Sequence, residues 1–461
     1  MNITGSLLQR VLLAALVWCF CAGAMTQEAQ EAQDAQDARG AQTLFRMTGS
    51  NTIGAELAPL LVRGYLADLG ATDIRQRSEG ERHWINASLE GREITVPIVA
   101  LGSSTGFKAL DSASADIGMA SRRIKLAEVE KLARFGNMSG AEAEHVIGLD
   151  ALVVAVHASN PITQLTIGQL RGIYRGEIRN WRELGGPDLA IRALHRDIES
   201  GTRATFDKEI FGGGHPAARG VHEVSGNAET HQIVLQQPGA IGYLPFADAG
   251  DVRRVAIKAG DLSAVIPDRG IIATEDFPLT RRLYLYRNPS QYHPHVESFL
   301  RFVEGRAGQA LVAQSGFINL TPVALSMTPY PNAPEEYRAL MERGQRLSIS
   351  FRFADGSTEL DSRARKDLRR LQEYIEQSDR ALTLTLVGFS DRKSNEKISD
   401  IISRFRALKV QGALLRDHQL GDSDILALGA FAPLTSNSEH APVKNSRVEV
   451  WIDSGDVGNP D

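Results

Sequence analysis

The stretch RDIESGTRATF, residues 196–206, gathers the side chains with the clearest chemistry in this sequence. Arg196, Ser200, Gly201 and Thr202 stand where an apolar run ends and an amphipathic segment begins. At such a junction the unpaired N–H groups of a helix N-terminus, hydroxyl donors and a guanidinium can together bind an anion. Taken alone, the stretch is better explained by a Ser/Thr N-cap with a solvated arginine nearby.

Three other segments place small donor residues between an expected strand and an expected helix. They are TGSNTIGAELAPLL (48–61), LGSSTGFKAL (101–110) and ADIGMASRRIK (115–125). In open α/β sheets, the loops at the carboxyl ends of the strands meet at one crevice, and glycines there let backbone N–H groups approach a ligand. The segments therefore predict an oxyanion site, and their candidate residues are Ser50, Thr52, Ser103, Ser104, Ser121 and Arg122.

The hydropathy pattern predicts the elements that position these loops. From Leu44 to about Val323, short apolar runs of strand character alternate with helical patterns. This alternation predicts an α/β fold with helices covering a mainly parallel or mixed sheet, and its length favours two lobes. A Pro-rich stretch follows at 321–337, and beyond it the order strand–helix–strand–helix–strand predicts a small α+β domain.

Six motifs follow one another in the order TGSNT, GSSTGFKAL, ADIGMASR, LTIGQLRGIYRGEIRNW, RDIESGTRATF and PGAIGYLPF. Over roughly residues 44–275 they resemble the periplasmic phosphate-binding proteins of ABC importers. The resemblance implies a two-lobed type II periplasmic binding protein-like domain that holds phosphate by hydrogen bonds between its lobes, with an ABC permease as a partner. Carried over by motif, it implies as ligands Thr52, the backbone of Ile53, Ser103, Arg196, Ser200, Gly201 and Thr202.

One position departs from the pattern of that family. Its best-known members place an aspartate, which accepts the proton of HPO₄²⁻ and so rejects sulfate, where Arg122 stands here. Arginine has no acceptor lone pair, so rejection of sulfate would need Asp197, Glu199 or Glu56. Inorganic phosphate remains the expected ligand, with another tetrahedral oxyanion as the alternative. The insert at 79–98 is expected to form a hairpin at the rim.

A second resemblance covers the end of the chain. Residues 386–410 read LVGFSDRKSNEKISDIISRFRALKV, with FADGSTELD before them and KNSRVEVWI after them. They resemble the peptidoglycan-binding domain at the C-terminus of outer membrane protein A. The resemblance implies that Asp391 and Arg406 bind the diaminopimelate of peptidoglycan stems, and one carboxylate with one guanidinium suits a zwitterionic amino acid. The alternative is a solvated aspartate and an arginine on a helix surface.

The departures from this second family are few. Ser390, Ser394 and Ser399 stand where threonine, a turn glycine and asparagine are usual. They leave the expected fold unchanged and weaken the expected affinity.

The amino end predicts export. Arg10 precedes the apolar run VLLAALVWCFCAGA, which is too short to span a bilayer, and AGA at 22–24 fits a cleavage site, so residues 1–24 are expected to be a signal peptide. Cys19 and Cys21 both lie within it, which leaves the mature chain without a thiol. The Gln- and Ala-rich residues 25–43 predict a flexible linker.

The expected organisation is a signal peptide (1–24), a linker (25–43), a two-lobed phosphate-binding domain (44–325) and an OmpA-like domain (326–461). A net charge of −5 argues against nucleic acid as a partner. The sequence contains no HExxH motif, other metal-ligand spacing or GxSxG elbow, and His195 is expected in the core or at the cleft rim. No cofactor, metal or catalytic residue is therefore expected.

The predicted function is that of a periplasmic solute-binding protein. It would capture phosphate between its lobes and be anchored to peptidoglycan, in association with the cell wall or outer membrane. Two alternatives remain: a structural cell-wall protein whose ligand site is degenerate, and a secreted hydrolase.

Overall fold

The computed structural model describes residues 41–212, 221–259, 264–327, 329, 332–353, 360–378, 382–391, 395–417, 423–431 and 445–453. The predicted signal peptide and nearly all of the predicted linker lie outside this part of the chain. Within it, none of the helices combines the length and the apolar character that crossing a membrane requires.

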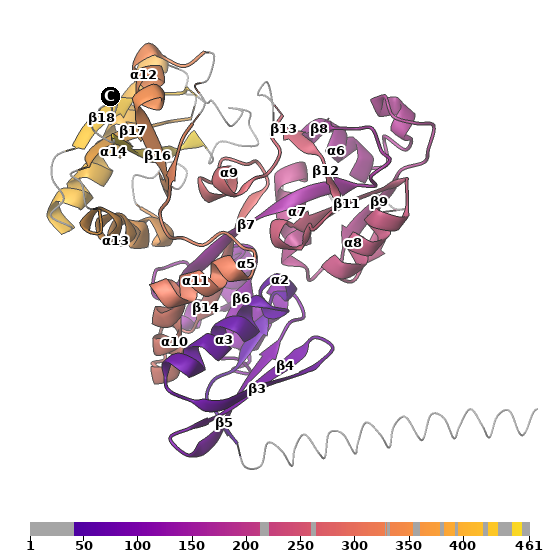
Figure 1. Cartoon of the computed structure of the whole chain (residues 1–461), viewed down its shortest axis with the longest axis vertical. Coiled ribbons are helices and arrows are strands. Elements are labelled where there is room, and N and C mark those ends of the chain that lie inside the picture. Colours follow the sequence, from indigo (N-terminus) through magenta and orange to yellow (C-terminus); the bar gives the residue numbers. More distant parts are fainter. Residues whose placement is uncertain are drawn as a thin grey trace, which may run out of the picture.

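The first lobe lies at the bottom of Figure 1 and is built mainly from the amino-terminal third of the chain. Its elements are β1 (Gln42–Thr43), β2 (Met47–Gly49), α2 (Asn51–Gly54), α3 (Leu57–Asp68), β3 (Thr72–Glu79), β4 (Arg82–Leu89), β5 (Arg92–Val99), α4 (Ser103–Asp111), β6 (Ile117–Ala120), α5 (Leu126–Lys131) and the 3₁₀ turn Ala133–Phe135. The chain later returns to this lobe with β14 (Thr280–Arg287), α10 (Pro294–Glu304) and α11 (Arg306–Gln314).

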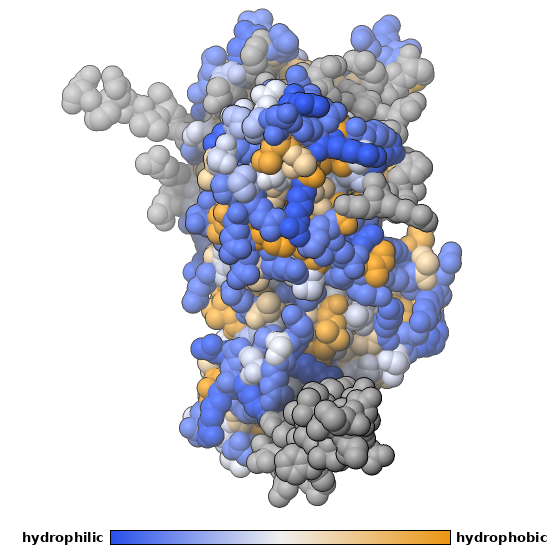
Figure 2. All heavy atoms as spheres, turned by 90° about the vertical axis from the view of Figure 1, so that its right-hand side faces the viewer, coloured by the Kyte–Doolittle hydropathy of each residue, from blue (hydrophilic) through white to orange (hydrophobic). Residues whose placement is uncertain are grey.

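The second lobe lies at the upper right of Figure 1 and is reached through the long strand β7 (Glu144–Val156). Its elements are β8 (Gln164–Thr166), α6 (Ile167–Tyr174), the 3₁₀ turn Trp181–Leu184, β9 (Arg192–Arg196), α7 (Gly201–Phe211), β10 (His222–Val224), α8 (Asn227–Gln236), β11 (Ala240–Pro245), the 3₁₀ turn Phe246–Asp248, β12 (Arg253–Arg254), β13 (Ala256–Lys258) and α9 (Arg269–Ala273). The face drawn in Figure 2 is mostly hydrophilic, with apolar residues scattered over it.

One mixed sheet runs through both lobes in the order β10-β9-β11-β7-β14-β6-β2-β5-β4-β3. All thirteen residues of β7 are buried, as expected of a strand that is covered on both faces. Strands β2, β5 and β6 pair in parallel, as do β9, β10 and β11, whereas β7 and β14 run antiparallel to their neighbours. The predicted mixed α/β sheet is thus confirmed.

The insert at 79–98 forms the hairpin that the sequence predicts. Strands β4 and β5 pair along their whole length, and Glu90 and Gly91 make the turn between them with positive φ angles. The preceding turn reaches the start of α2, because Asn51 Nδ2 donates to Glu81 Oε2 at 3.2 Å. Residues 42–43, the last two of the predicted linker, pair with β5.

The C-terminal domain lies at the upper left of Figure 1. Its elements are β15 (Ala324–Leu325), α12 (Glu335–Arg343), β16 (Gly344–Arg352), α13 (Ser362–Glu376), β17 (Thr383–Gly388), α14 (Glu396–Asp417), β18 (Ser423–Ala427) and β19 (Arg447–Asp453). The sheet order is β15-β16-β19-β17-β18, with β17 and β18 parallel. Its core is formed with α13 and α14 and includes Leu347, Leu371, Leu386 and Val410.

Buried ion pairs join the C-terminal domain to the lobes. Glu275, just before β14, binds Arg352 at 3.0 Å and Arg363 at 3.1 Å, and Asp276 binds the buried Arg346. Burial alone would raise the pKa of Glu275, but nearby guanidinium groups, with Arg282 first, outweigh it and hold that pKa well below its usual value. The junction is therefore a charged contact in which each of these carboxylates is paired with at least one arginine.

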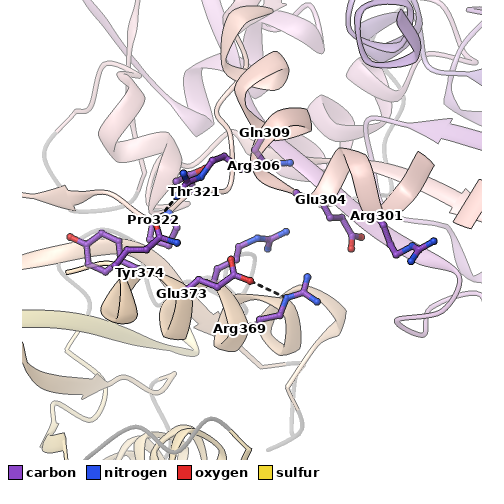
Figure 3. Close-up of a pocket in the computed structure, with 12 residues that line it drawn as sticks. Arg301, Glu304, Arg306, Gln309, Thr321, Pro322, Arg369, Glu373 and Tyr374 are labelled. Carbon is purple, nitrogen blue, oxygen red and sulfur yellow. Dashed lines mark hydrogen bonds and ion pairs between the residues drawn. The ribbon is translucent and has the colours of Figure 1, made fainter. Parts of the chain in front are cut away.

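A cavity of about 340 Å³ lies at the same junction (Figure 3). Arg301 and Glu304 reach it from α10, and Arg369 and Glu373 from α13, where the last two form an ion pair of 3.6 Å. Its lining residues lie outside the predicted anion site, so this cavity is distinct from the one that the sequence predicts.

Candidate functional site

Hydroxyl groups from three of the predicted loops and from α7 meet between the two lobes. Thr52 Oγ1 of the first lobe lies 3.4 Å from Thr202 Oγ1 of the second. Ser103 Oγ lies 3.4 Å from Ser121 Oγ and accepts the Ser121 N–H at 3.0 Å. All four side chains are buried. Loops that lie between 18 and 150 residues apart in the sequence therefore form one cluster of donors.

Gly201 brings the N-terminus of α7 against this cluster. A Cβ atom at this position would lie 2.1 Å from Ser103 Oγ and 2.4 Å from Ser121 Oγ, so only glycine allows the approach. Ser200 is the N-cap of α7 and accepts the Arg203 N–H, so the helix begins at the cluster. We call Thr52, Ser103, Ser121, Gly201 and Thr202, together with an arginine–aspartate pair that contacts them, the oxyanion cradle, because hydroxyls and a helix N-terminus are among its donors.

The guanidinium in the oxyanion cradle belongs to Arg281, which the sequence analysis missed. Its Nη1 donates to Thr202 Oγ1 at 2.8 Å, and its Nη2 donates to Thr52 Oγ1 at 3.3 Å. Its Nε and Nη2 also donate to Asp150 Oδ2, at 2.9 and 2.7 Å. Asp150 and Arg281 are almost fully buried, at 1% and 4% exposure. The pair thus holds the threonines of both lobes.

The sequence does carry a signal for this pair. Asp150 is the charged residue in the middle of the apolar run HVIGLDALVVAV, and Arg281 begins the run RRLYLYR. A charged group inside a strand that is buried on both faces needs an opposite charge beside it. The next residue, Arg282, binds Glu275 and Asp361 at the domain junction, each at 2.7 Å, so consecutive arginines of β14 serve two different sites.

The two arginines that the sequence analysis selected are bound elsewhere. Arg196 donates to Asn227, to Asp197 Oδ2 at 3.1 Å and to the Ser225 carbonyl at 3.2 Å. Arg122 forms a bidentate ion pair with Glu128 at 2.8 and 2.6 Å.

The remaining predicted residues lie around the oxyanion cradle in supporting roles. Ser104 Oγ accepts from Arg122 at 3.1 Å. Ser50 is buried, and its carbonyl accepts the Ile53 N–H at 3.2 Å. Ile53 therefore has its amide engaged within the first turn of α2.

Two of the carboxylates expected to replace the missing aspartate are also engaged. Asp197 binds Arg196, and Glu199 binds Lys108 at 2.8 Å. The hydrogen bond from Lys108 lowers the pKa of Glu199. The carboxylate that touches the guanidinium of the cradle is instead Asp150.

His195 is a core residue. It lies at 3% exposure among Tyr174, Phe206 and Tyr243, and its Nδ1 is 2.8 Å from Tyr243 Oη. Of the two predicted positions, core and cleft rim, the structure shows the core, and His195 gives Ser200 no histidine base. Across the described ranges, no group of three or more His, Cys, Asp or Glu residues could hold a metal ion.

Asp391 and Arg406 are both buried at one end of the C-terminal sheet, at 8% and 3% exposure. Asp391 Oδ2 accepts the Ser446 hydroxyl at 2.5 Å, whereas Oδ1 is buried and, among the described residues, has no hydrogen-bond partner. Arg406 Nη1 donates to the Phe389 carbonyl at 3.1 Å, and its guanidinium lies over the Phe353 ring. The alternative of a solvated aspartate and a surface arginine is therefore wrong.

The helix that carries Arg406 folds back beside the turn that carries Asp391. Ser399 Oγ on α14 donates to the Asp391 carbonyl at 3.2 Å, and the Ser403 carbonyl packs against Gly388, where a Cβ atom would lie 2.1 Å from it. Ser390 Oγ also donates to the Asp391 carbonyl, at 3.0 Å. Ser394 lies outside the described residues.

Known protein families match both the two-lobed region and the C-terminal domain. The model of the PBP superfamily domain matches residues 79–305, and that of the OmpA family matches residues 352–447. The phosphate-binding protein PstS of Pseudomonas aeruginosa is 30% identical over 245 residues, which cover 49% of this chain and 75% of that protein. The chain belongs to the PstS family of phosphate-binding proteins, with a C-terminal domain of the OmpA family.

A second curated relative and one solved structure are also similar to this chain. The phosphate-binding protein PstS of Bacillus subtilis is 28% identical over 238 residues, which cover 51% of this chain and 75% of that protein. The crystal structure of an ABC-type phosphate transport receptor from Vibrio cholerae superposes with a TM-score of 0.47 at 22% identity, covering 59% of this chain and 99% of that one. The names of the two PstS relatives describe binding rather than catalysis.

Proposed function

We propose that this protein captures inorganic phosphate, or a similar tetrahedral oxyanion, between its two lobes. The observation that carries the proposal is the oxyanion cradle itself: four buried hydroxyls, a glycine at a helix N-terminus and one arginine converge from both lobes. A tetrahedral oxyanion accepts many hydrogen bonds in different directions, and this set of donors matches that demand.

Charge balance in the cradle favours hydrogen bonding over ion pairing. Asp150 already neutralises Arg281 at 2.7 Å, so the pair adds little net positive charge. The anion would be held by hydroxyl and amide donors and by the N-terminal end of α7. Because the aspartate position of the family is Arg122, bound to Glu128, we propose poorer rejection of sulfate than is usual in the family.

Calorimetry of the dialysed mature chain with phosphate tests this proposal. We expect one saturable site without turnover, and at least a tenfold loss of affinity in Ser103→Ala and Thr202→Val. The exposed Ser159→Ala is the matched control and should bind like the wild type. Release of phosphate from an ester would favour the hydrolase, and absence of any binding would favour a structural protein with a degenerate site. Competition with sulfate at two pH values tests the specificity.

We also propose that the C-terminal domain anchors the chain to peptidoglycan. The supporting observation is Asp391, whose buried Oδ1 faces no hydrogen-bond donor among the described residues. The ammonium group of an amino acid would satisfy it, and Arg406 on the adjacent helix offers a guanidinium for the carboxylate. A chain anchored in this way would act in the periplasm and would deliver its ligand to an ABC permease.

A pull-down with purified sacculi tests the anchor on the full mature chain. We expect the wild type to sediment with the sacculi, and Asp391→Ala and Arg406→Ala to stay largely in the supernatant. Asp424→Asn, on the exposed side of β18, is the matched control. Sedimentation of both variants at the wild-type level would refute the anchoring role while leaving the phosphate site untouched.

A further inference from the structure

Helix α14 exposes a row of large apolar side chains. Of the twelve large apolar residues that the described part of the chain exposes, five lie on this one helix: Ile398, Ile401, Phe405, Leu408 and Leu415, with exposures between 43% and 67%. We call these five residues the outer stripe. Scattered single exposures are normal on a protein surface, whereas a contiguous row marks an interaction site.

The spacing of the outer stripe is that of a coiled-coil seam. Its members follow one another at intervals of three, four, three and seven residues, which places them at the a and d positions of a heptad. Gly412 occupies the a position within the last interval, and the Arg416 guanidinium lies beside it, because a Cβ atom there would be 3.1 Å from Arg416 Nη1. The seam extends over about 25 Å of helix.

The opposite face of α14 already packs on its own sheet. Ala407, Val410 and Leu414 are buried in the core of the C-terminal domain. A helix that is apolar on two opposite faces is normally covered on both. A seam limited to a and d positions favours a second helix over a lipid surface, because membrane-bound helices present a broader apolar face.

The residues that flank the seam have one sign of charge. The e and g positions carry Lys397, Arg404, Lys409 and Arg416, and the remaining two are Ile402 and Gln411. The acidic Asp400 lies outside these positions, against Gly429. In a pair of α14 helices from two copies, basic flanks would face basic flanks, and like charges at these positions disfavour pairing. Acidic flanks on the partner would instead be complementary.

We propose that the outer stripe docks an amphipathic helix whose flanks are acidic, supplied by another protein. The partner would present apolar residues at heptad spacing to Ile401 and Phe405, and carboxylates to Arg404 and Arg416. The docking face lies on the C-terminal domain, so it is independent of the oxyanion cradle, and its failure would leave the phosphate proposal untouched.

Two synthetic helical peptides test the proposal against the full mature chain. Both carry Leu and Ile at a and d; one has Glu at every e and g position, and the other has Lys. Fluorescence anisotropy should show saturable binding of the acidic peptide, weakened as salt increases, and at least tenfold weaker binding of the basic peptide. No binding of the acidic peptide, or equal binding of both, would overturn the proposal.

Variants of exposed residues separate the seam from its flanks. Phe405→Glu should weaken binding of the acidic peptide at least tenfold, whereas Leu126→Glu, on a more exposed apolar residue outside α14, should not. The double variant Arg404→Glu and Arg416→Glu should abolish the preference between the peptides, because Lys397 and Lys409 then balance the two new carboxylates. Circular dichroism checks that each variant remains folded.

Two further outcomes would assign the outer stripe to a different binding partner. A wild-type dimer in sedimentation that Phe405→Glu abolishes would assign the seam to a second copy. Binding to phosphatidylglycerol vesicles that Phe405→Glu abolishes, without binding of the acidic peptide, would assign it to a membrane. Either result overturns the proposal.

Discussion

Each of the two candidate sites contains an arginine and an aspartate, but the two sets are satisfied in different ways. In the oxyanion cradle, Arg281 and Asp150 bind each other at 2.7 Å, and the arginine also holds the threonines of both lobes. In the C-terminal domain, Asp391 binds the Ser446 hydroxyl and Arg406 binds a backbone carbonyl. One Asp391 oxygen is left buried without a donor among the described residues.

The difference separates a pair that positions its neighbours from a pair with an acceptor that is unpaired among the described residues. A buried pair that is closed on itself fixes the geometry of its neighbours, and a ligand must then be held by those neighbours. A buried acceptor without a donor costs free energy until a ligand supplies one. We therefore expect Arg281 and Asp150 to matter for stability and positioning, and Asp391 to matter for binding.

The largest effect is expected from breaking the closed pair. Arg281→Met leaves Asp150 charged in the core, and we expect a loss of about 3–5 kcal/mol in the free energy of unfolding, together with loss of phosphate binding. Adding Asp150→Asn should recover much of the stability without restoring binding. Urea denaturation and calorimetry measure both. If Arg281→Met alone is as stable as the wild type, the Arg281–Asp150 pair does not stabilise the fold.

Filling the cradle should have the next largest effect. In Gly201→Ala, the new methyl group would lie 2.1 Å from Ser103 Oγ, so the serines must move. We expect about 1–3 kcal/mol of destabilisation and at least a hundredfold loss of phosphate affinity. Gly226→Ala has open space around the new methyl group and is the matched control. Equal affinities in the two variants would show that the anion binds elsewhere.

A third test measures how the stability of the protein depends on pH through Glu304, a paired carboxylate at the domain junction. Burial opposes ionisation of Glu304, but His145 and Lys366 outweigh it and lower the pKa of Glu304 to about 2. Its stabilisation is then fully present above about pH 4.5 and is lost as pH falls toward 2. We expect this to contribute roughly 1–3 kcal/mol. The free energy of unfolding should therefore depend less on pH in Glu304→Gln than in the wild type over that interval. Identical profiles would show that ionised Glu304 does not stabilise the fold.

The contributions of Arg196 and Arg281 to phosphate affinity can be compared directly. Because Arg196 is bound to Asn227 and Asp197, we expect Arg196→Gln to reduce phosphate affinity less than tenfold, well below the effect of Arg281→Met. Calorimetry on both variants decides the ranking. A larger loss in Arg196→Gln would mean that its side chain turns into the cradle when the anion binds.

The smallest effect on stability is expected at the open site. Asp391→Asn removes a buried charge that lacks a full set of donors, so we expect a change below about 0.5 kcal/mol, or a slight gain. Sacculus binding should fall at least tenfold in the same variant. Marked destabilisation by Asp391→Asn would show that this aspartate stabilises the fold as Asp150 is expected to do. The proposed difference between the two sites would then be wrong.

The sequence predicted the part of the cradle that depends on local patterns. Thr52, Ser103, Ser121 and Thr202 follow strands, and the carboxyl ends of neighbouring strands must meet, so their convergence followed from the motifs. The pair of Asp150 and Arg281 joins residues 131 positions apart. Its only local sign is a charge inside an apolar strand, which says that a partner exists but not which one.

Other features depended on side-chain direction, which spacing alone does not determine. The motif placed Arg196 at the mouth of α7, but its guanidinium turns to Asn227. The pattern predicted α14 as a helix, but only its packing showed that one apolar face is buried and the other exposed. The same holds for Glu275 and Asp276, whose acidic character gave no indication that they join two domains.

The alternation of side chains along β14 has a mechanical consequence. Arg281 points into the oxyanion cradle, and its neighbour Arg282 is clamped by Glu275 and Asp361 at the junction with the C-terminal domain. If that domain is held fixed while the rest of the molecule is pulled, part of the tension enters the sheet at Arg282. The load therefore reaches Arg281 and the oxyanion cradle, one peptide unit away along β14.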